Sequence, residues 1–299
     1  MPAAQEFFWV GIPVFAAFVA LEFFILWRQQ RAYSWQEGAT SLALGIGNKL
    51  SATYKLGFAV WATMFVWEHR AFEVPLATWW GPIALFVAVE FSYYWFHRLS
   101  HEIRWMWATH AVHHSPNELN ILAAFRLGWT GSLSGQFLVY LPIIWLGFHP
   151  VAVGGMLALN LLYQSWIHTD LIGKLGWFDR VFNSPSNHRV HHASNPDYID
   201  RNYGGVLIIF DRMFGTYVEE RADEPCRYGL VQPLQSHNPL WIAFHEWVAM
   251  VKDVLSARSL REVVGYMFGP PGWKPDAARH TNATPIDTAQ PERQAVRLT

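Results

Sequence analysis

The stretch "YYWFHRLSHEIRWMWATHAVHH", residues 93–114, decides how this chain must fold. It contains two short histidine groups, "HRLSH" and "HAVHH", in which imidazoles lie three or four residues apart. Side chains at these separations share one face of an α-helix. The stretch therefore predicts helical segments that each direct two or three imidazoles toward a common point.

The same spacing returns further along the chain, in "HRVHH" at 188–192, and "HTD" adds one more histidine at position 168. Imidazole nitrogens bind Fe, Zn, Cu and Ni, and one ion accepts about four to six ligands. Nine clustered donors exceed the capacity of one ion, so the pattern favours a centre of two metals. The expected ligands are His97, His101, His110, His113, His114, His168, His188, His191 and His192. The other five are unclustered, and we expect structural roles for His69, His149, His237, His245 and His280.

Two carboxylates are candidates for orienting these ligands. A metal-bound imidazole usually donates its second N–H to a carboxylate or a carbonyl. Glu90 lies seven residues before His97 on the same predicted helical face, in an apolar segment where an unpaired carboxylate would be costly. Asp170 follows His168 by two residues and is the second candidate; the alternative for it is an ordinary loop carboxylate.

Apolar runs surround the histidines. The 299-residue chain is 52% hydrophobic and 15% charged, whereas about a quarter of an average globular protein is charged. A bilayer core needs about 20 apolar helical residues, so we predict membrane-spanning helices at 7–27, 50–67 and 82–101. Two shorter runs, 133–148 and 151–166, either cross the membrane or re-enter it. The predicted fold class is all-α: a polytopic integral membrane helical bundle with a cytoplasmic histidine-rich cap that holds a di-metal centre.

Charge patterning sets the predicted orientation. Arg28 and Arg31 follow the first apolar run, and positive residues mark the cytoplasmic side. Counting crossings then places the histidines at the cytoplasmic surface. The predicted layout is transmembrane helices at 1–80, the catalytic domain at 81–220, an interfacial amphipathic helix region at 221–268 and a disordered tail at 269–299. In the third region, a helix over 240–255 either lies on the membrane surface or packs against the core.

A known family shares these motifs. The stretch at 93–114 and "NSPSNHRVHHASNPDYIDRNYGGVLIIFDRMFGTY" at 183–217 resemble the sterol desaturase and fatty acid hydroxylase superfamily of membrane non-haem di-iron oxygenases. The sequences around "FHRLSHE" and "YIDRNYGG" are also similar to the alkylglycerol monooxygenase branch, which uses tetrahydropterin. The segment "NILAAFRLGW" at 120–129 departs from the pattern of that branch. The resemblance implies that the nine clustered histidines hold two irons and that the domain attacks a C–H bond of a lipid with O₂.

The implied function is hydroxylation or desaturation of a fatty acyl, sterol or ether lipid that arrives from the bilayer. Aromatic residues near the motifs either line a channel for the lipid or anchor the protein at the membrane interface; these are Trp95, Trp105, Trp107, Phe125 and Trp129. Two electrons must come from a separate reductase, ferredoxin or reduced pterin, because the sequence has no haem-binding CxxCH and no thiolate cluster for iron–sulfur. Iron follows from the reaction class, and zinc could replace it in purified material.

Two other functions remain open from the residues alone. A membrane-surface zinc-dependent lipid hydrolase would use metal-bound hydroxide and would work without oxygen. A metal carrier would place histidines at mid-membrane depth, which the clustering at one surface disfavours. A nucleic-acid partner is disfavoured because the net charge of −1 supplies no excess of cations for phosphates.

Overall fold

The computed structural model describes residues 2–275, and within that range the regular secondary structure is helical. Two isolated β-bridges join Phe182 to Leu207 and Ala193 to Tyr228. The predicted all-α class is therefore confirmed. The elements, in chain order, are α1 Pro2–Arg28, α2 Trp35–Glu68, α3 Gly81–Glu102, α4 Arg104–His114, η1 Ile121–Phe125, η2 Gln136–Tyr140, α5 Leu141–Trp145, α6 Pro150–Ser165, η3 Phe178–Arg180, α7 Pro185–His192, α8 Ile209–Phe214, α9 Pro239–Ser256 and α10 Leu260–Phe268.

The three long apolar runs lie inside α1, α2 and α3. The run 133–148 instead forms η2 and the five-residue α5. This segment turns at Gly147, whose φ of 109° is a conformation that other residues rarely adopt. Most of the next run, 151–166, is the continuous helix α6. None of the helices in residues 2–275 combines the length and the hydropathy of a complete membrane span.

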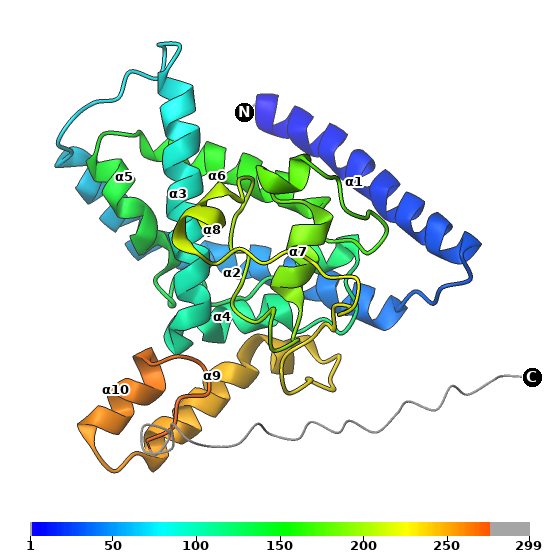
Figure 1. The fold of residues 1–299 in the computed structure, drawn as a ribbon. Coiled ribbons are helices and arrows are strands. Elements are labelled where there is room, and N and C mark those ends of the chain that lie inside the picture. The colour runs from blue at the N-terminus through cyan, green and yellow to red at the C-terminus, as the bar shows by residue number, and fades with distance from the viewer. Residues whose placement is uncertain (1, 276–299) are drawn as a thin grey trace, which may run out of the picture.

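Helices α4 and α7 lie near the middle of the molecule, with α1 along one side (Figure 1). Helices α9 and α10 are joined by residues 257–259 and form a hairpin at the lower left of that view. We call these two helices the C-terminal hairpin. The predicted tail is described only as far as residue 275, and there the Trp273 ring packs against Tyr266 of α10 at a centroid distance of 5.3 Å. The remainder of that prediction, 276–299, lies outside the described residues.

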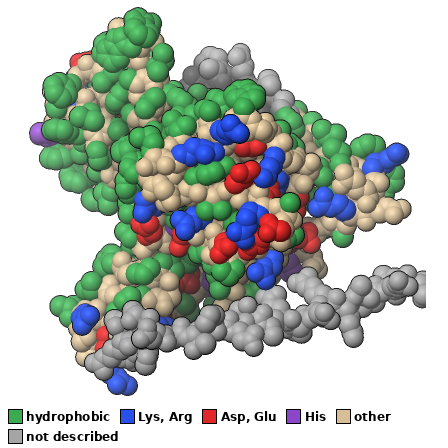
Figure 2. Space-filling view, viewed as in Figure 1, with side chains coloured by type: hydrophobic (Ala, Val, Ile, Leu, Met, Phe, Trp, Pro, Cys, Tyr) green, Lys and Arg blue, Asp and Glu red, His purple; other side chains and the backbone are tan. Residues whose placement is uncertain are grey.

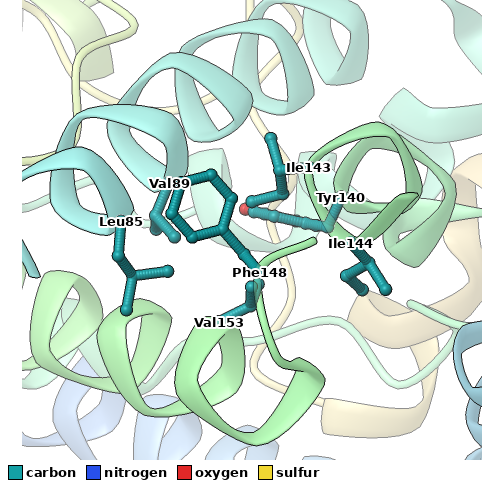
Figure 3. Close-up of a cluster of buried hydrophobic side chains, with 7 residues drawn as sticks. All are labelled: Leu85, Val89, Tyr140, Ile143, Ile144, Phe148 and Val153. Atoms are coloured by element: carbon teal, nitrogen blue, oxygen red, sulfur yellow. The ribbon is translucent and has the colours of Figure 1, made fainter. Parts of the chain in front are cut away.

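An apolar cluster holds α3 against residues 140–153, which follow the "HAVHH" motif in the chain. Figure 3 shows how side chains of α3, of residues 140–148 and of α6 interdigitate. Burial of each large aliphatic side chain contributes about 1.5–3 kcal/mol. This packing fixes the N-terminal half of α3, which precedes the first histidine motif. The buried members are Leu85, Val89, Tyr140, Ile143, Ile144, Phe148 and Val153.

Two buried glutamates connect the N-terminal helices to the histidine-bearing part. Glu22 of α1 accepts hydrogen bonds from the Thr169 hydroxyl at 2.6 Å and from the Ile121 amide at 2.9 Å. Glu37 of α2 pairs with Arg126, whose Nε donates to the Ser115 hydroxyl at 2.8 Å. The Glu37 and Arg126 side chains are only 7% and 1% exposed. Thr169 follows His168 and Ser115 follows His114, so α1 and α2 are tied to residues next to expected ligands.

Candidate metal centre

Five of the expected ligands form one buried group. The two histidines of α3 meet two from α4 and one from α7, and their candidate ligand nitrogens all lie within 4.8 Å of one another. The helical spacing explains this geometry, because each pair from α3 and α4 is separated by four residues and shares one helix face. We call His97, His101, His110, His114 and His191 the five-histidine group.

The other four expected ligands form a second group with the same 4.8 Å limit. His113 comes from α4, His188 and His192 come from α7, and His168 lies just after α6. We call these residues the four-histidine group. Helices α4 and α7 thus contribute to both groups, which makes the groups neighbours. The structure brings together all nine histidines that the sequence analysis selected.

Hydrogen bonds at one nitrogen of each ring show which nitrogen faces the interior of its histidine group. The Nδ1 atoms of His97, His168 and His191 lie 2.7–2.9 Å from the carbonyl oxygens of Tyr203, Gln164 and Arg201, respectively. A carbonyl oxygen can only accept a hydrogen bond, so these Nδ1 atoms carry the proton. The Nε2 atoms of these three rings therefore present lone pairs to the interior of the groups, as metal ligands must.

The segment 200–203 provides outer partners for three members of the five-histidine group. His101 Nδ1 donates to the Asp200 carboxylate at 3.2 Å, while the Arg201 and Tyr203 carbonyls accept from His191 and His97. Asp200 and Asn202 have φ values of 58° and 57°, a left-handed conformation that Asn and Asp tolerate better than most residues. The motif "YIDRNYGG" contains this segment, but its role as the acceptor of imidazole N–H groups was not predicted.

Buried polar side chains hold that segment in place. The Asn202 amide donates to the carbonyls of Asn187 and Val218 at 3.0 and 2.8 Å. The Asp211 carboxylate accepts from the amides of Tyr203 and Gly204 at 2.7 and 2.8 Å. Burial raises the pKa of Asp211 to about 6, and these hydrogen bonds oppose the rise. The Asn–Tyr–Gly–Gly sequence thus forms a turn that wraps a carboxylate.

Neither of the two carboxylates that were expected to orient a ligand accepts a hydrogen bond from an imidazole. Glu90 accepts from Asn160 at 2.5 Å and from the amides of Val206 and Leu207 at 2.8 and 2.9 Å, rather than from an imidazole. It therefore holds the chain just after the 200–203 segment, one step further from the ligands than expected. Asp170 accepts from the Tyr228 hydroxyl and lies 3.6 Å from Arg31, so its role is that of the alternative, a loop carboxylate.

Burial favours the neutral form of His114, His168 and His191. It lowers the pKa of His168 to about 4, against an opposing hydrogen bond to the Gln164 carbonyl. Burial, with neighbouring imidazoles as a second cause, also holds the pKa values of His114 and His191 well below the usual range. Neutral imidazole is the form that binds metals.

The spacing of the inward nitrogens fits metal ions. Within the groups, Nε2 atoms lie 3.0 Å apart in His97–His110, 2.9 Å in His168–His188 and 3.1 Å in His188–His192. Two nitrogens bound to one ion at about 2.1 Å and at right angles would lie about 3.0 Å apart. The Nε2 atoms of His101 and His191 are buried without a hydrogen-bond partner among the described residues. A cation would satisfy these lone pairs, so the residues present fit two ions.

Residues 82–216, which include all nine histidines, match the family model of the fatty acid hydroxylases. The chain thus contains a fatty acid hydroxylase domain. The match runs from the second residue of α3 to Thr216 and so includes the 200–203 segment and Asp211.

Several curated relatives are similar to this chain, and the alkylglycerol monooxygenases match most of it. The alkylglycerol monooxygenase of Xenopus tropicalis is 34% identical over 278 residues, which is 90% of this chain and 61% of the relative. That of Homo sapiens is 32% identical, covering 89% of this chain and 60% of the relative. The ornithine lipid hydroxylase OlsE of Rhizobium tropici is 30% identical, covering 44% and 40%. The chain spans about three fifths of the length of the alkylglycerol monooxygenases. No solved structure matches it.

Of the aromatic residues considered for a lipid channel, Trp107 lies beside the site. Its ring centroid is 5.2 Å from that of His101 and 5.6 Å from that of His114. Trp105 and Trp129 instead donate hydrogen bonds to the carbonyls of Leu133 and Leu44, and each of these contacts joins a helix to the turns at 129–135.

Proposed function

We propose that this fatty acid hydroxylase homologue is a membrane-bound, O₂-dependent monooxygenase of lipids, with an alkylglycerol ether as the first substrate to test. The observation that carries the proposal is the pair of buried histidine groups with lone pairs directed inward. The similarity to alkylglycerol monooxygenases supports the choice of substrate over a fatty acyl or sterol lipid.

The nine histidines would hold two irons, five around one ion and four around the other. Iron supplies the oxidising power that attack on an alkyl C–H bond needs, which redox-inert zinc does not. The chain's own residues hold the ligands in one tautomer. Asp200 and the carbonyls of Gln164, Arg201 and Tyr203 accept the outer N–H groups. Burial lowers the pKa of His168 and His191 and so favours their neutral form.

The overall reaction balances with an external donor: RH + O₂ + 2e⁻ + 2H⁺ gives ROH and H₂O. For an alkylglycerol, hydroxylation at the chain carbon next to the ether oxygen yields a hemiacetal, which separates into a fatty aldehyde and glycerol. The two electrons would come from a reduced pterin, a ferredoxin or a separate reductase. Tetrahydropterin is the donor to test first, because the resemblance to the alkylglycerol monooxygenase branch implies it.

We further propose that apolar helices embed the protein in a membrane, with the histidines on the cytoplasmic side. Large apolar side chains are exposed along α1, α2 and α3, among them Trp27 at 62%, Trp61 at 60% and Ile83 at 57%. Figure 2 shows hydrophobic surface gathered at the upper left, whereas the central face carries many charged side chains. Such a division suits a protein that is half in lipid and half in water.

The test uses the full chain in membranes, loaded with Fe²⁺ and given 1-O-hexadecylglycerol, tetrahydropterin and O₂. We expect hexadecanal, its formation dependent on O₂ and iron, and about two irons per chain. If lipid mass spectrometry finds no oxidised or dehydrogenated product from any membrane lipid, the oxygenase proposal is wrong. Lipid hydrolysis that persists under argon with Zn²⁺ would instead support the zinc hydrolase.

A further inference from the structure

A cavity opens directly onto the histidines. It measures about 180 Å³, less than the roughly 300–1,000 Å³ of sites that enclose a drug-sized ligand. His101, His114, His191 and His192 line its inner side, so it reaches both histidine groups. Its outer wall is largely apolar and comes from three separate segments: Ile199, Leu230 and Val231, and Pro270 and Pro271.

One buried arginine holds the C-terminal hairpin, and with it the Pro270–Pro271 part of the wall. Arg104, between the two histidine motifs of α3 and α4, donates to Glu246 at 2.9 Å and to Asp253 at 2.6 Å. Its backbone amide also donates to the Gly269 carbonyl at 3.0 Å, immediately before Pro270. The Arg104 side chain is 7% exposed. Glu246 and Asp253 are seven residues apart on one face of α9, and both turn toward α4.

The outer face of the hairpin is apolar and leads to this wall. On α10, Leu260, Val264 and Phe268 are four residues apart, so they form one stripe, and they are 78%, 49% and 53% exposed. The stripe ends two residues before Pro270. On α9, Val251 and Leu255 are 51% and 81% exposed. Helix α9 packs its opposite face, with Ile242 and Ala243, against Leu44 and Val112.

We propose that the C-terminal hairpin guides the alkyl chain of a membrane lipid to the histidines, and that Pro270 and Pro271 limit the cavity to an unbranched chain. The occupant is an alkyl chain because an apolar stripe continues into a narrow, apolar-walled cavity whose inner side is the proposed metal centre. With about 180 Å³ beside the histidines, the cavity suits a slender chain better than a bulky ring system. The inference rests on the proposed function, because that function supplies the reaction. The path of the alkyl chain can nevertheless be tested without any turnover.

Photo-crosslinking tests the path in the absence of O₂. Full-length protein in phosphatidylcholine vesicles receives an alkylglycerol with a diazirine in its chain, and crosslinked peptides are identified by mass spectrometry. We expect adducts in 260–271 and 229–231. Adducts confined to other segments, or no adducts, would overturn the proposed path. Failure of the oxygenase proposal does not affect this result, since no oxidation is required.

The preference of variants for linear or branched substrates tests the role of the wall formed by Pro270 and Pro271. The substrates are 1-O-hexadecylglycerol and its methyl-branched analogue 1-O-phytanylglycerol. Since one methyl group in a tight pocket changes kcat/KM by about 10–200-fold, we expect Pro270→Ala/Pro271→Ala to raise the branched-to-linear ratio at least tenfold. Leu230→Trp should lower turnover of both substrates, and Pro233→Ala, an exposed control outside the cavity, should match the wild type. Iron content should be unchanged in all of them. An unaltered ratio in the double variant with normal iron would refute the role of the wall.

Discussion

The rings of His114 and His192 stack at a centroid distance of 4.5 Å and an interplanar angle of 22°, although they belong to different histidine groups. They sit where α4 and α7 meet, so one pair of helices shapes both candidate metal positions. A shift of either helix should therefore disturb both groups, whereas the loss of a single ligand or of an outer partner should act mainly on one.

Removing one ligand from each group separates their contributions. We expect His113→Ala to impair the four-histidine group and His191→Ala the five-histidine group, each lowering iron from about two toward one per chain and turnover by more than about a hundredfold. Metal analysis and O₂-dependent product formation are the measurements. His237→Ala, outside both groups, is the control. Full iron and full turnover in either ligand variant would contradict the assignment.

Asp200 should affect iron affinity through His101. Asp200→Ala removes the acceptor for His101 Nδ1 and is expected to weaken iron binding about 10–100-fold. Asp200→Asn should weaken it less, because its side-chain oxygen still accepts and Asn tolerates the positive φ. Competition with a chelator measures this. Asp223→Ala changes a carboxylate that is 85% exposed and should leave the affinity at the wild-type value; equal affinities in all four proteins would disprove the role.

The buried Glu37–Arg126 pair should matter for stability. Arg126→Met leaves a buried unpaired carboxylate, which typically costs about 3–5 kcal/mol. The double variant Glu37→Leu/Arg126→Met removes both charges and should recover most of that loss. Thermal unfolding in detergent checks the order of the three proteins. Arg70→Met breaks a pair with the 73%-exposed Glu73 and should change little. A double variant as unstable as the single one would show that the charge pairing is not the cause.

The raised pKa of Asp211 leads us to expect that the stability of the folded chain depends on pH. Its pKa is about 6 in the folded chain, above the ordinary 3.8, so the folded state binds the proton more tightly than the unfolded state. The resulting stabilisation is full below about pH 4 and disappears as the pH rises through about 6; its size is on the order of 3 kcal/mol. Asp211→Asn lacks it. The wild type should therefore lose stability relative to this variant between pH 4 and pH 7, measured by denaturant unfolding; a constant difference would exclude the effect.

The sequence predicted the helical class and the nine converging histidines because both depend on local spacing. His97 and His101 are placed together by one helix turn, whatever the rest of the chain does. Glu90 was chosen by the same reasoning, yet its partners, Asn160, Val206 and Leu207, are 70 to 117 residues away. No periodicity encodes such a contact.

The 200–203 segment was harder still to predict. Two of its three acceptors are backbone carbonyls, which every residue has, and their positions depend on the left-handed conformation of Asp200 and Asn202. The wall of Pro270 and Pro271 was missed for a different reason. A proline-rich composition predicts disorder, while the amide of Arg104, far away in the chain, holds Gly269 in place.

The hydrogen bond from Thr169 to Glu22 and the pairing of Arg126 with Glu37 have a consequence for biogenesis. Residues beside His168 and His114 are held by the first two helices, which are synthesised long before α7 leaves the ribosome. The newly made chain would thus complete the two histidine groups only after α1 and α2 have docked onto a much later part of it. Metal insertion would be a late maturation step, and a chaperone or protease could recognise the empty groups as unfinished.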